Sequence, residues 1–140
     1  MNKDRHNELL GKSLSYHENN DCAVIALATV ADIPYEDAHA ALELAGRKNR
    51  KGTTLGEIRE ALGVLDINFL PLKEAYIRKP NKNSKWGFNR YTYKTIKKRF
   101  PTGRWLVANR NHIVGMVNGE IHDWASERKH PIINVWKILN

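Results

Sequence analysis

The sequence predicts an α+β domain in which N-terminal helices pack on a C-terminal antiparallel sheet. Three observations predict this fold class: an uncharged apolar run at residues 22–30, helix-capping residues that recur through the first half, and an Asn118-Gly119 pair between two apolar runs in the second half. Helices followed by strands along one chain are typical of α+β proteins. With 140 residues, 41% of them hydrophobic, we expect one domain over residues 1–140.

Residues 22–30 are predicted to form a buried helix. Asn19, Asn20 and Asp21 stand directly before this run, and asparagine and aspartate are among the preferred N-cap residues. The run is rich in alanine, leucine and β-branched residues and carries no charge, so we expect its surroundings to be apolar on most sides.

Two further helices are predicted in the first half. One covers residues 34–44, because proline is favoured in a first helical turn and Gly46 is a suitable terminator. The other covers residues 54–63, because Thr54 and Glu57 have the spacing of a capping box.

The second half is predicted to consist mainly of strands. Residues 73–90, with several turn-forming side chains, are expected to form a long loop. A short basic helix over residues 92–100 ends before Pro101, because proline disfavours helical geometry in the residue before it. Strands are predicted at residues 66–72, 104–108, 113–117, 120–124 and 133–139.

The chain is basic, with 23 Lys and Arg against 15 Asp and Glu and a formal charge of +8. Such a charge favours nucleic acid or an acidic protein as a partner, although a solvated basic surface produces the same balance. Aromatic and basic residues alternate within the predicted loop and the helix after it. We therefore take Trp86, Arg90 and Lys94 as candidate binding residues, as in a nucleic-acid or partner groove.

Cys22 is the only cysteine, which excludes an intrachain disulfide and a multi-cysteine zinc site. We expect no metal ion and no organic cofactor, and we expect four further histidines at the surface: His6, His17, His39 and His130. No segment approaches the roughly 18 apolar residues of a transmembrane helix. Residues 1–15 form a polar lead-in without the apolar core of a secretory signal. These features predict a cytoplasmic protein without a membrane partner.

The Asn118-Gly119 turn predicts a contact between a histidine and a carboxylate. In a two-residue hairpin Val117 faces Glu120, so Val114 faces Asp123 and His112 faces residue 125. His112 and Asp123 then lie on one face as diagonal neighbours, about 7–8 Å apart at the backbone and within reach of a hydrogen bond. His122 alternates with Asp123 and points to the opposite face.

Cys22 occupies the first turn of its predicted helix. The free N–H groups and the positive end of the helix dipole stabilise an anion there, and a nearby imidazolium lowers the pKa of a thiol further. The same N–H groups can hold the oxyanion of a tetrahedral intermediate. A nucleophile, a base and a residue that orients the base together form an activated-nucleophile arrangement.

These residues resemble small papain-like cysteine peptidase domains of phage and bacterial proteins, which are similar to the peptidase domains of bacteriocin exporters. The resemblance lies in residues 20–28, in Pro34-Tyr35 and in residues 112–123, and extends in outline over residues 16–125. It implies a papain-like fold and a cysteine-dependent peptidase or isopeptidase acting on a protein or peptide. It further implies Cys22 as nucleophile, His112 as base and Asp123 as the orienting acid, in the host cytoplasm if the protein is phage-encoded.

Many papain-like enzymes carry an oxyanion-hole glutamine shortly before the cysteine, and this chain contains no glutamine. The side-chain amide of Asn20 or Asn19 is a candidate substitute, with the backbone N–H of Cys22 as second donor. The hydroxyl of Tyr16 stands at the spacing of that glutamine and is a further candidate.

The sequence leaves other functions open. The same triad serves acetyl transfer and transglutaminase-type exchange. The alternative from another class is a catalytically inactive papain-like protein that binds nucleic acid or a host protein through its basic loop. A small effector that modifies or blocks a host protein is a third reading. The sequence specifies neither a substrate nor an oligomeric state.

Overall fold

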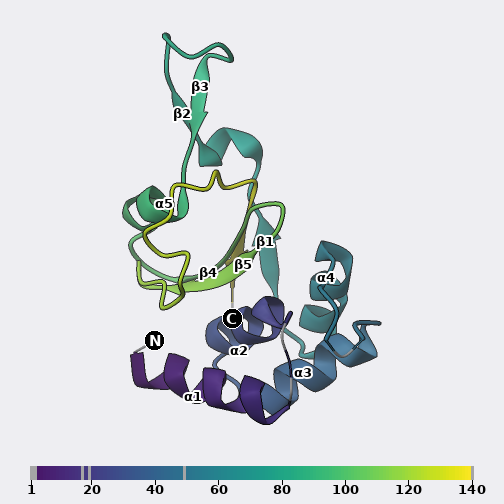
Figure 1. Cartoon of the computed structure of the whole chain (residues 1–140). Helices are drawn as coiled ribbons and strands as arrows, with labels where there is room; N and C mark the ends of the chain where they lie inside the picture. The colour runs from purple at the N-terminus through teal and green to yellow at the C-terminus, as the bar shows by residue number, and fades with distance from the viewer. Residues whose placement is uncertain (1–2, 17, 19, 49, 140) are drawn as a thin grey trace.

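The computed structural model of the chain describes residues 3–16, 18, 20–48 and 50–139 and has a mixed α+β architecture (Figure 1). Four helices precede the strands of the main sheet, as the predicted fold class requires. The helices are α1 (Lys3–Ser15), α2 (Cys22–Ala31), α3 (Tyr35–Leu44), α4 (Leu55–Val64) and α5 (Tyr93–Arg99), with a 3-10 turn η1 (Glu74–Ile77). The strands are β1 (Phe69–Pro71), β2 (Arg78–Pro80), β3 (Phe88–Arg90), β4 (Arg104–Ala108), β5 (Ile113–Val117) and β6 (Asn134–Ile138).

The predicted helices of the first half are confirmed as α2, α3 and α4. The capping box at α4 is formed, with the Glu57 N–H donating to Thr54 Oγ1 at 3.1 Å and the Thr54 N–H donating to Glu57 Oε1 at 2.8 Å. Gly46 follows α3 with φ +108°, a left-handed conformation that favours glycine and ends the helix.

Helix α1 was not predicted, because residues 1–15 look like a polar lead-in. Of its leucines, Leu9 alone is fully buried, so the helix has a very narrow apolar stripe. Tertiary contacts hold it in place: the Arg5 guanidinium donates to the carbonyl of Ile33, and Lys12 Nζ lies 2.7 Å from a carboxylate oxygen of Glu36. The hydrophobic periodicity of the sequence does not reveal such contacts.

The main sheet has the order β1-β6-β4-β5 and is antiparallel throughout. Helix α2 packs directly on β5, and Gly115 of β5 makes this possible. A Cβ atom at Gly115 would lie 2.9 Å from the carbonyl oxygen of Ala26 and 3.0 Å from the side chain of Thr29. The close approach brings the start of α2 beside the start of β5, and therefore places Cys22 beside His112.

The long loop predicted at residues 73–90 is instead η1 followed by a two-stranded hairpin, β2–β3, which projects from the end of the molecule opposite α1–α3 (Figure 1). Pro80 pairs with Phe88 in the last pair of the ladder, next to the loop over residues 81–87, where a missing N–H costs little. The Arg78 guanidinium stacks 4.0 Å from the centre of the Phe88 ring. This cross-strand cation–π contact stabilises strands that are too short to show an alternating pattern.

The strand predicted at residues 120–124 is wrong. Val117 and Glu120 form the predicted pair, and Asn118 and Gly119 both have positive φ, as a type I′ turn requires. The pairing ends there as an isolated bridge.

Beyond Glu120 the chain turns rather than extends. The Ser126 N–H donates to the carbonyl of Asp123 at 3.1 Å, a turn hydrogen bond in place of a ladder. Ile121 and Ala125 are buried in one core cluster under the sheet, while Asp123 between them is partly exposed. The turn thus places both apolar residues in the core. Among the described residues, no helix is long and apolar enough to cross a membrane.

Candidate active site

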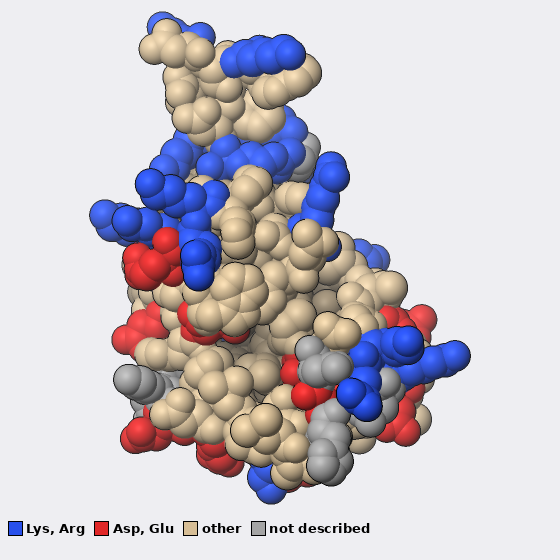
Figure 2. Space-filling model, viewed as in Figure 1, with Lys and Arg blue, Asp and Glu red and all other residues tan. Residues whose placement is uncertain are grey.

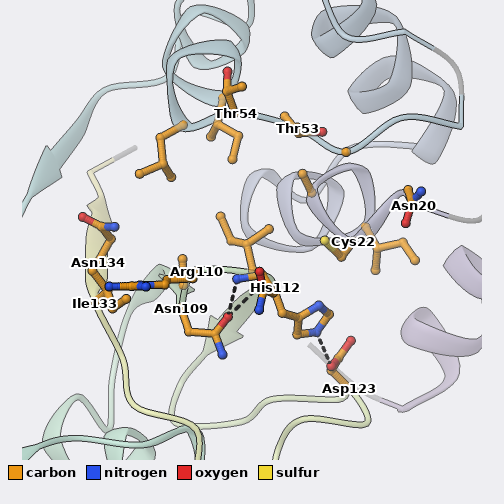
Figure 3. A pocket seen from close by; sticks show the side chains of 18 of the residues that line it. Asn20, Cys22, Thr53, Thr54, Asn109, Arg110, His112, Asp123, Ile133 and Asn134 are labelled. Atoms are coloured by element: carbon orange, nitrogen blue, oxygen red, sulfur yellow. Dashed lines mark hydrogen bonds and ion pairs between the residues drawn. The ribbon is translucent and has the colours of Figure 1, made fainter.

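Cys22, His112 and Asp123 meet at one end of a cleft of about 1200 Å³ (Figure 3). One wall comes from the start of α2 and the segment leading into α4. The other comes from the β4–β5 turn, the turn after β5 and the start of β6. The lining residues include Asn20, Asp21, Cys22, Ile25, Thr53, Thr54, Leu55, Ile58, Arg90, Asn109, Arg110, His112, Asp123, Trp124, Ile133 and Asn134. Residues far apart in sequence thus surround the sulfur.

Cys22 is the first residue of α2 and is partly exposed. Asp21 holds the N-cap position, but its side chain makes no capping hydrogen bond, contrary to the expectation from sequence. Its carboxylate accepts instead from the Tyr35 hydroxyl at 2.6 Å. Asp21 therefore leaves the first N–H groups of α2 available to the sulfur or to an oxyanion.

The electrostatics of Cys22 favour a thiolate. Burial alone raises the pKa of the thiol, but a hydrogen bond with His112 and the backbone N–H groups of Ile113 and Ala23 outweigh burial, so the pKa is lowered. Burial likewise lowers the pKa of His112, and hydrogen bonds to Asp123 and Cys22 more than reverse this, raising it to about 9. Both shifts favour a thiolate beside an imidazolium.

The imidazole of His112 is oriented from both sides. Its Nε2 lies 2.8 Å from Oδ2 of Asp123, which leaves Nδ1 to face Cys22 (Figure 3). The side chains of His112 and Asp123 are 10% and 19% exposed, so their hydrogen bond is largely shielded from water. Oδ2 of Asp123 also accepts the N–H of Ala125 at 3.0 Å. The contact predicted from strand register is present, although Asp123 reaches His112 from a turn.

Two residues of the site were not anticipated. The Trp124 ring lies over His112, with ring centres 4.6 Å apart and planes 32° apart, while 62% of the residue stays exposed. Asn109 Oδ1 accepts the N–H groups of Asn111 and His112, each at 2.8 Å, and so shapes the turn that carries His112. An asparagine whose side chain accepts the N–H groups two and three residues further along the chain is typical of a turn.

The two candidate oxyanion donors have different surroundings. Asn20 lines the cleft beside Cys22, where its Nδ2 donates to the carbonyl of Arg50 at 3.3 Å (Figure 3). Asn19 lies outside the described residues. Tyr16 is not among the residues that line the cleft; its ring packs 5.1 Å from Tyr35 and 4.9 Å from the ring of His39. The structure therefore brings Asn20, and not Tyr16, to the sulfur.

A buried charge network fixes the segment before Cys22. The Glu18 side chain is fully buried and accepts from Arg47 Nη1 at 2.8 Å and Nη2 at 3.1 Å, and from the Arg50 N–H at 2.8 Å. His39 Nε2 lies 2.7 Å from Glu18, so His39 is buried rather than at the surface as expected. Arg47 Nη2 also donates to the carbonyl of Asn20 at 3.2 Å.

The pKa of Glu18 follows from these contacts. Burial alone raises it, but the hydrogen bonds from Arg47, Arg50 and His39 outweigh burial and lower it to about 2. A fully paired carboxylate thus anchors the chain shortly before Cys22.

The candidate binding residues separate into two places. Trp86, 72% exposed, and Arg90 line a second hollow together with Pro131, and Arg90 also lines the main cleft. Lys94 is exposed on α5 and lines neither. The structure therefore joins Trp86 and Arg90 and leaves Lys94 apart.

His122 was expected to point to the opposite face, but it lines a small hollow together with Cys22 and Asp123, and its Nε2 lies 2.9 Å from Glu120. Within the described part of the chain, no three His, Cys, Asp or Glu side chains are placed to hold a metal ion. Comparison with protein-family models, with curated proteins and with solved structures finds no match.

Proposed function

We propose that the chain is a papain-like cysteine hydrolase that cleaves a peptide, isopeptide or related amide bond by acyl transfer. One observation carries the proposal: Cys22 at a helix start faces His112 across the cleft, and Nε2 of His112 lies 2.8 Å from Asp123, an arrangement that lowers the pKa of Cys22 and raises that of His112. A buried structural cysteine needs none of these contacts. The packing of the cysteine helix on the strand opened by the histidine further supports a papain-like arrangement.

The first half of the reaction forms an acyl-enzyme. The Cys22 thiolate attacks the carbonyl carbon, a C–S bond forms, and the carbonyl oxygen takes the negative charge. The first N–H groups of α2 face that oxygen, and the Asn20 amide is a further donor once it releases Arg50. His112, as imidazolium, gives a proton to the leaving nitrogen while the C–N bond breaks and a thioester remains.

The second half releases the acid. The now neutral His112 takes a proton from water as the oxygen of that water attacks the thioester carbonyl. The C–S bond then breaks, the carboxylic acid leaves, and the thiolate and imidazolium are restored. Asp123 holds the imidazole in one orientation and stabilises its charged form through both steps. No step calls for a metal or an organic cofactor.

The test is the pH dependence of Cys22 alkylation by iodoacetamide in the wild type and in His112→Ala. We expect rapid alkylation well below pH ~8.5, the ordinary pKa of cysteine, and a return to ordinary behaviour in His112→Ala. His122→Ala is the matched control and leaves the profile unchanged. A wild-type thiol that reacts only as fast as a free cysteine refutes the proposal.

A second candidate function is binding through the β2–β3 hairpin without catalysis, on nucleic acid or a host protein. It is favoured by Trp86, whose exposed ring has Lys85 Nζ 5.2 Å from its centre on a projecting hairpin. Such a surface can stack on unpaired bases and neutralise phosphates. Binding to a single-stranded oligonucleotide that weakens steeply with salt and is lost in Trp86→Ala favours this function.

A further inference from the structure

Arg110 extends into the cleft from the β4–β5 turn, two residues before the base (Figure 3). It is exposed, and among the described residues it has no hydrogen bond, ion pair or ring contact. Arg90, on the same wall, differs because it is tied to the protein by a weak hydrogen bond to the Ile132 carbonyl and a 5.8 Å cation–π contact with Phe88. Arg110 is thus a cation held at the cleft without an internal partner.

The carboxylates that line the cleft are already engaged. Asp21 accepts from the Tyr35 hydroxyl at 2.6 Å, and Asp123 lies 2.8 Å from His112. Neither is directed at Arg110. The cleft therefore offers a ligand a positive charge, that of Arg110. A guanidinium binds a carboxylate well, by paired N–H···O bonds.

The cleft beside Arg110 is apolar. Leu55 and Ile58 of α4 line it on one side, and Ile133, just before β6, lines it on the other. Thr53 Oγ1, shielded from solvent on the first side, has no hydrogen-bond partner among the described atoms. An apolar side chain of a ligand fits this lining. A backbone amide of an extended peptide ligand supplies a hydrogen-bond partner for the Thr53 hydroxyl.

Positive charge continues beyond Arg110. Figure 2 shows Lys and Arg side chains gathered over the part of the molecule that carries the β2–β3 hairpin, and that hairpin holds Arg78, Lys79, Lys82, Lys85 and Arg90. Arg90 connects the hairpin to the cleft, because it lines both the cleft and the hollow beneath Trp86. A ligand that leaves the cleft on this side meets further cations.

We propose that the cleft selects acidic peptide segments, with an apolar side chain against Leu55, Ile58 and Ile133 and the carboxylate of a neighbouring Asp or Glu on Arg110. This rests on the proposed function, for which it names the substrate class. Side-chain carboxylates suit the observations better than a single chain terminus, because the cations extend from the cleft onto the hairpin. The apolar wall favours a peptide over a nucleic acid.

The test measures binding to the Cys22→Ala variant, which cannot turn over. The probes are two fluorescein-labelled, C-terminally amidated peptides in a Ser/Gly background, one with a Leu-Glu-Glu segment and one with Leu-Lys-Lys. We expect the acidic peptide to bind at least about tenfold more tightly, a difference of about 1.4 kcal/mol. Arg110→Glu, added to Cys22→Ala, abolishes or reverses that preference.

Lys98→Glu is the matched control. It makes the same change in net charge at an exposed position of α5 that lines no part of the cleft. It changes the preference less than about twofold, because Lys98 does not line the cleft and salt weakens interactions between exposed charges. Thermal unfolding of each variant verifies that all are folded.

Three results overturn the inference: equal binding of the two peptides, a preference that survives Arg110→Glu, or an oligothymidylate that binds more tightly than the acidic peptide and displaces it. The alkylation experiment tests the proposed function independently of the peptide-binding experiment. An ordinary thiol in the alkylation experiment with an Arg110-dependent peptide preference refutes the hydrolase and keeps the cleft as an acidic-peptide site. An activated thiol without that preference refutes this inference alone.

Discussion

Nε2 of His112 lies 2.8 Å from Oδ2 of Asp123, and the opposite side of the same imidazole faces Cys22 (Figure 3). The histidine therefore stands between a carboxylate and a thiol. This relationship raises the pKa of His112 to about 9 against the opposing effect of burial. The interaction of His112 with Cys22 also helps to lower the pKa of the Cys22 thiol. A change at His112 or at Asp123 is therefore expected to alter the reactivity of the sulfur.

Asp123→Asn removes the charge that stabilises the His112 imidazolium. A neighbouring opposite charge shifts a pKa by about 1–3 units, so we expect the pKa of His112 to fall and that of Cys22 to rise. Alkylation of Cys22 near pH 6.5 then slows about tenfold or more, as stopped-time labelling and mass spectrometry can measure. Glu120→Gln, which removes the partner of His122, serves as control. An unchanged rate in Asp123→Asn contradicts the assigned role.

Amide hydrolysis and alkylation are expected to separate at high pH. The folded His112 has a raised pKa of about 9, so above that pH it loses the proton that the leaving amine needs. Alkylation needs only the thiolate, whose lowered pKa keeps it present there. Hydrolysis therefore falls above about pH 9 while alkylation continues. Hydrolysis that stays constant well above pH 9 in the folded protein would falsify the assignment of His112 as proton donor.

Trp124→Ala removes the ring that lies 4.6 Å from His112. An aromatic contact of this kind contributes about 0.5–1.5 kcal/mol, so we expect the alkylation rate below pH 7 to fall about two- to tenfold. Global stability changes little, because the residue is 62% exposed. Trp86→Ala, also at an exposed tryptophan but on the hairpin, leaves the rate unchanged. Equal effects of the two substitutions exclude a specific role of Trp124.

Glu18→Gln leaves the buried guanidinium of Arg47 without its carboxylate. Breaking a buried ion pair costs about 3–5 kcal/mol, which urea unfolding at pH 7 measures directly. The depressed pKa of about 2 also sets a pH window, since Glu18 contributes stability above its unfolded value of 4.5 and loses it as the pH falls toward about 2. The gap between wild type and Glu18→Gln therefore narrows over that range. The exposed Glu60→Gln produces no such gap.

Gly115→Ala tests the packing that brings Cys22 to His112. The added Cβ meets the Ala26 carbonyl at 2.9 Å, so the helix or the strand has to shift, and overpacking of this kind costs about 1–3 kcal/mol. Gly63→Ala in α4 is the matched control: nothing lies within 4 Å of its Cβ position, and alanine there stabilises by about 0.5–1 kcal/mol. Equal unfolding midpoints for the two variants contradict the close approach.

Local signals in the sequence predicted the parts of the fold that local energetics control. The capping box at Thr54 and Glu57, the glycine after α3 and the Asn118-Gly119 turn all appear where the residues indicate, because each satisfies nearby backbone groups. Helix α1 and the β2–β3 hairpin were missed. Helix α1 depends on contacts across the fold, such as that of Arg5 with Ile33, and the hairpin depends on the cross-strand contact of Arg78 with Phe88.

Sequence by itself determined the identity of Cys22, His112 and Asp123 as candidates, since a lone cysteine at a helix start and a histidine at a strand start are local features. The tertiary structure alone decided how they meet. Gly115 lets α2 approach β5, the chain after Glu120 turns instead of pairing, and Glu18 anchors the segment before the sulfur. Packing and buried charge pairing between distant segments fix these distances, and neither leaves a short-range pattern in the chain.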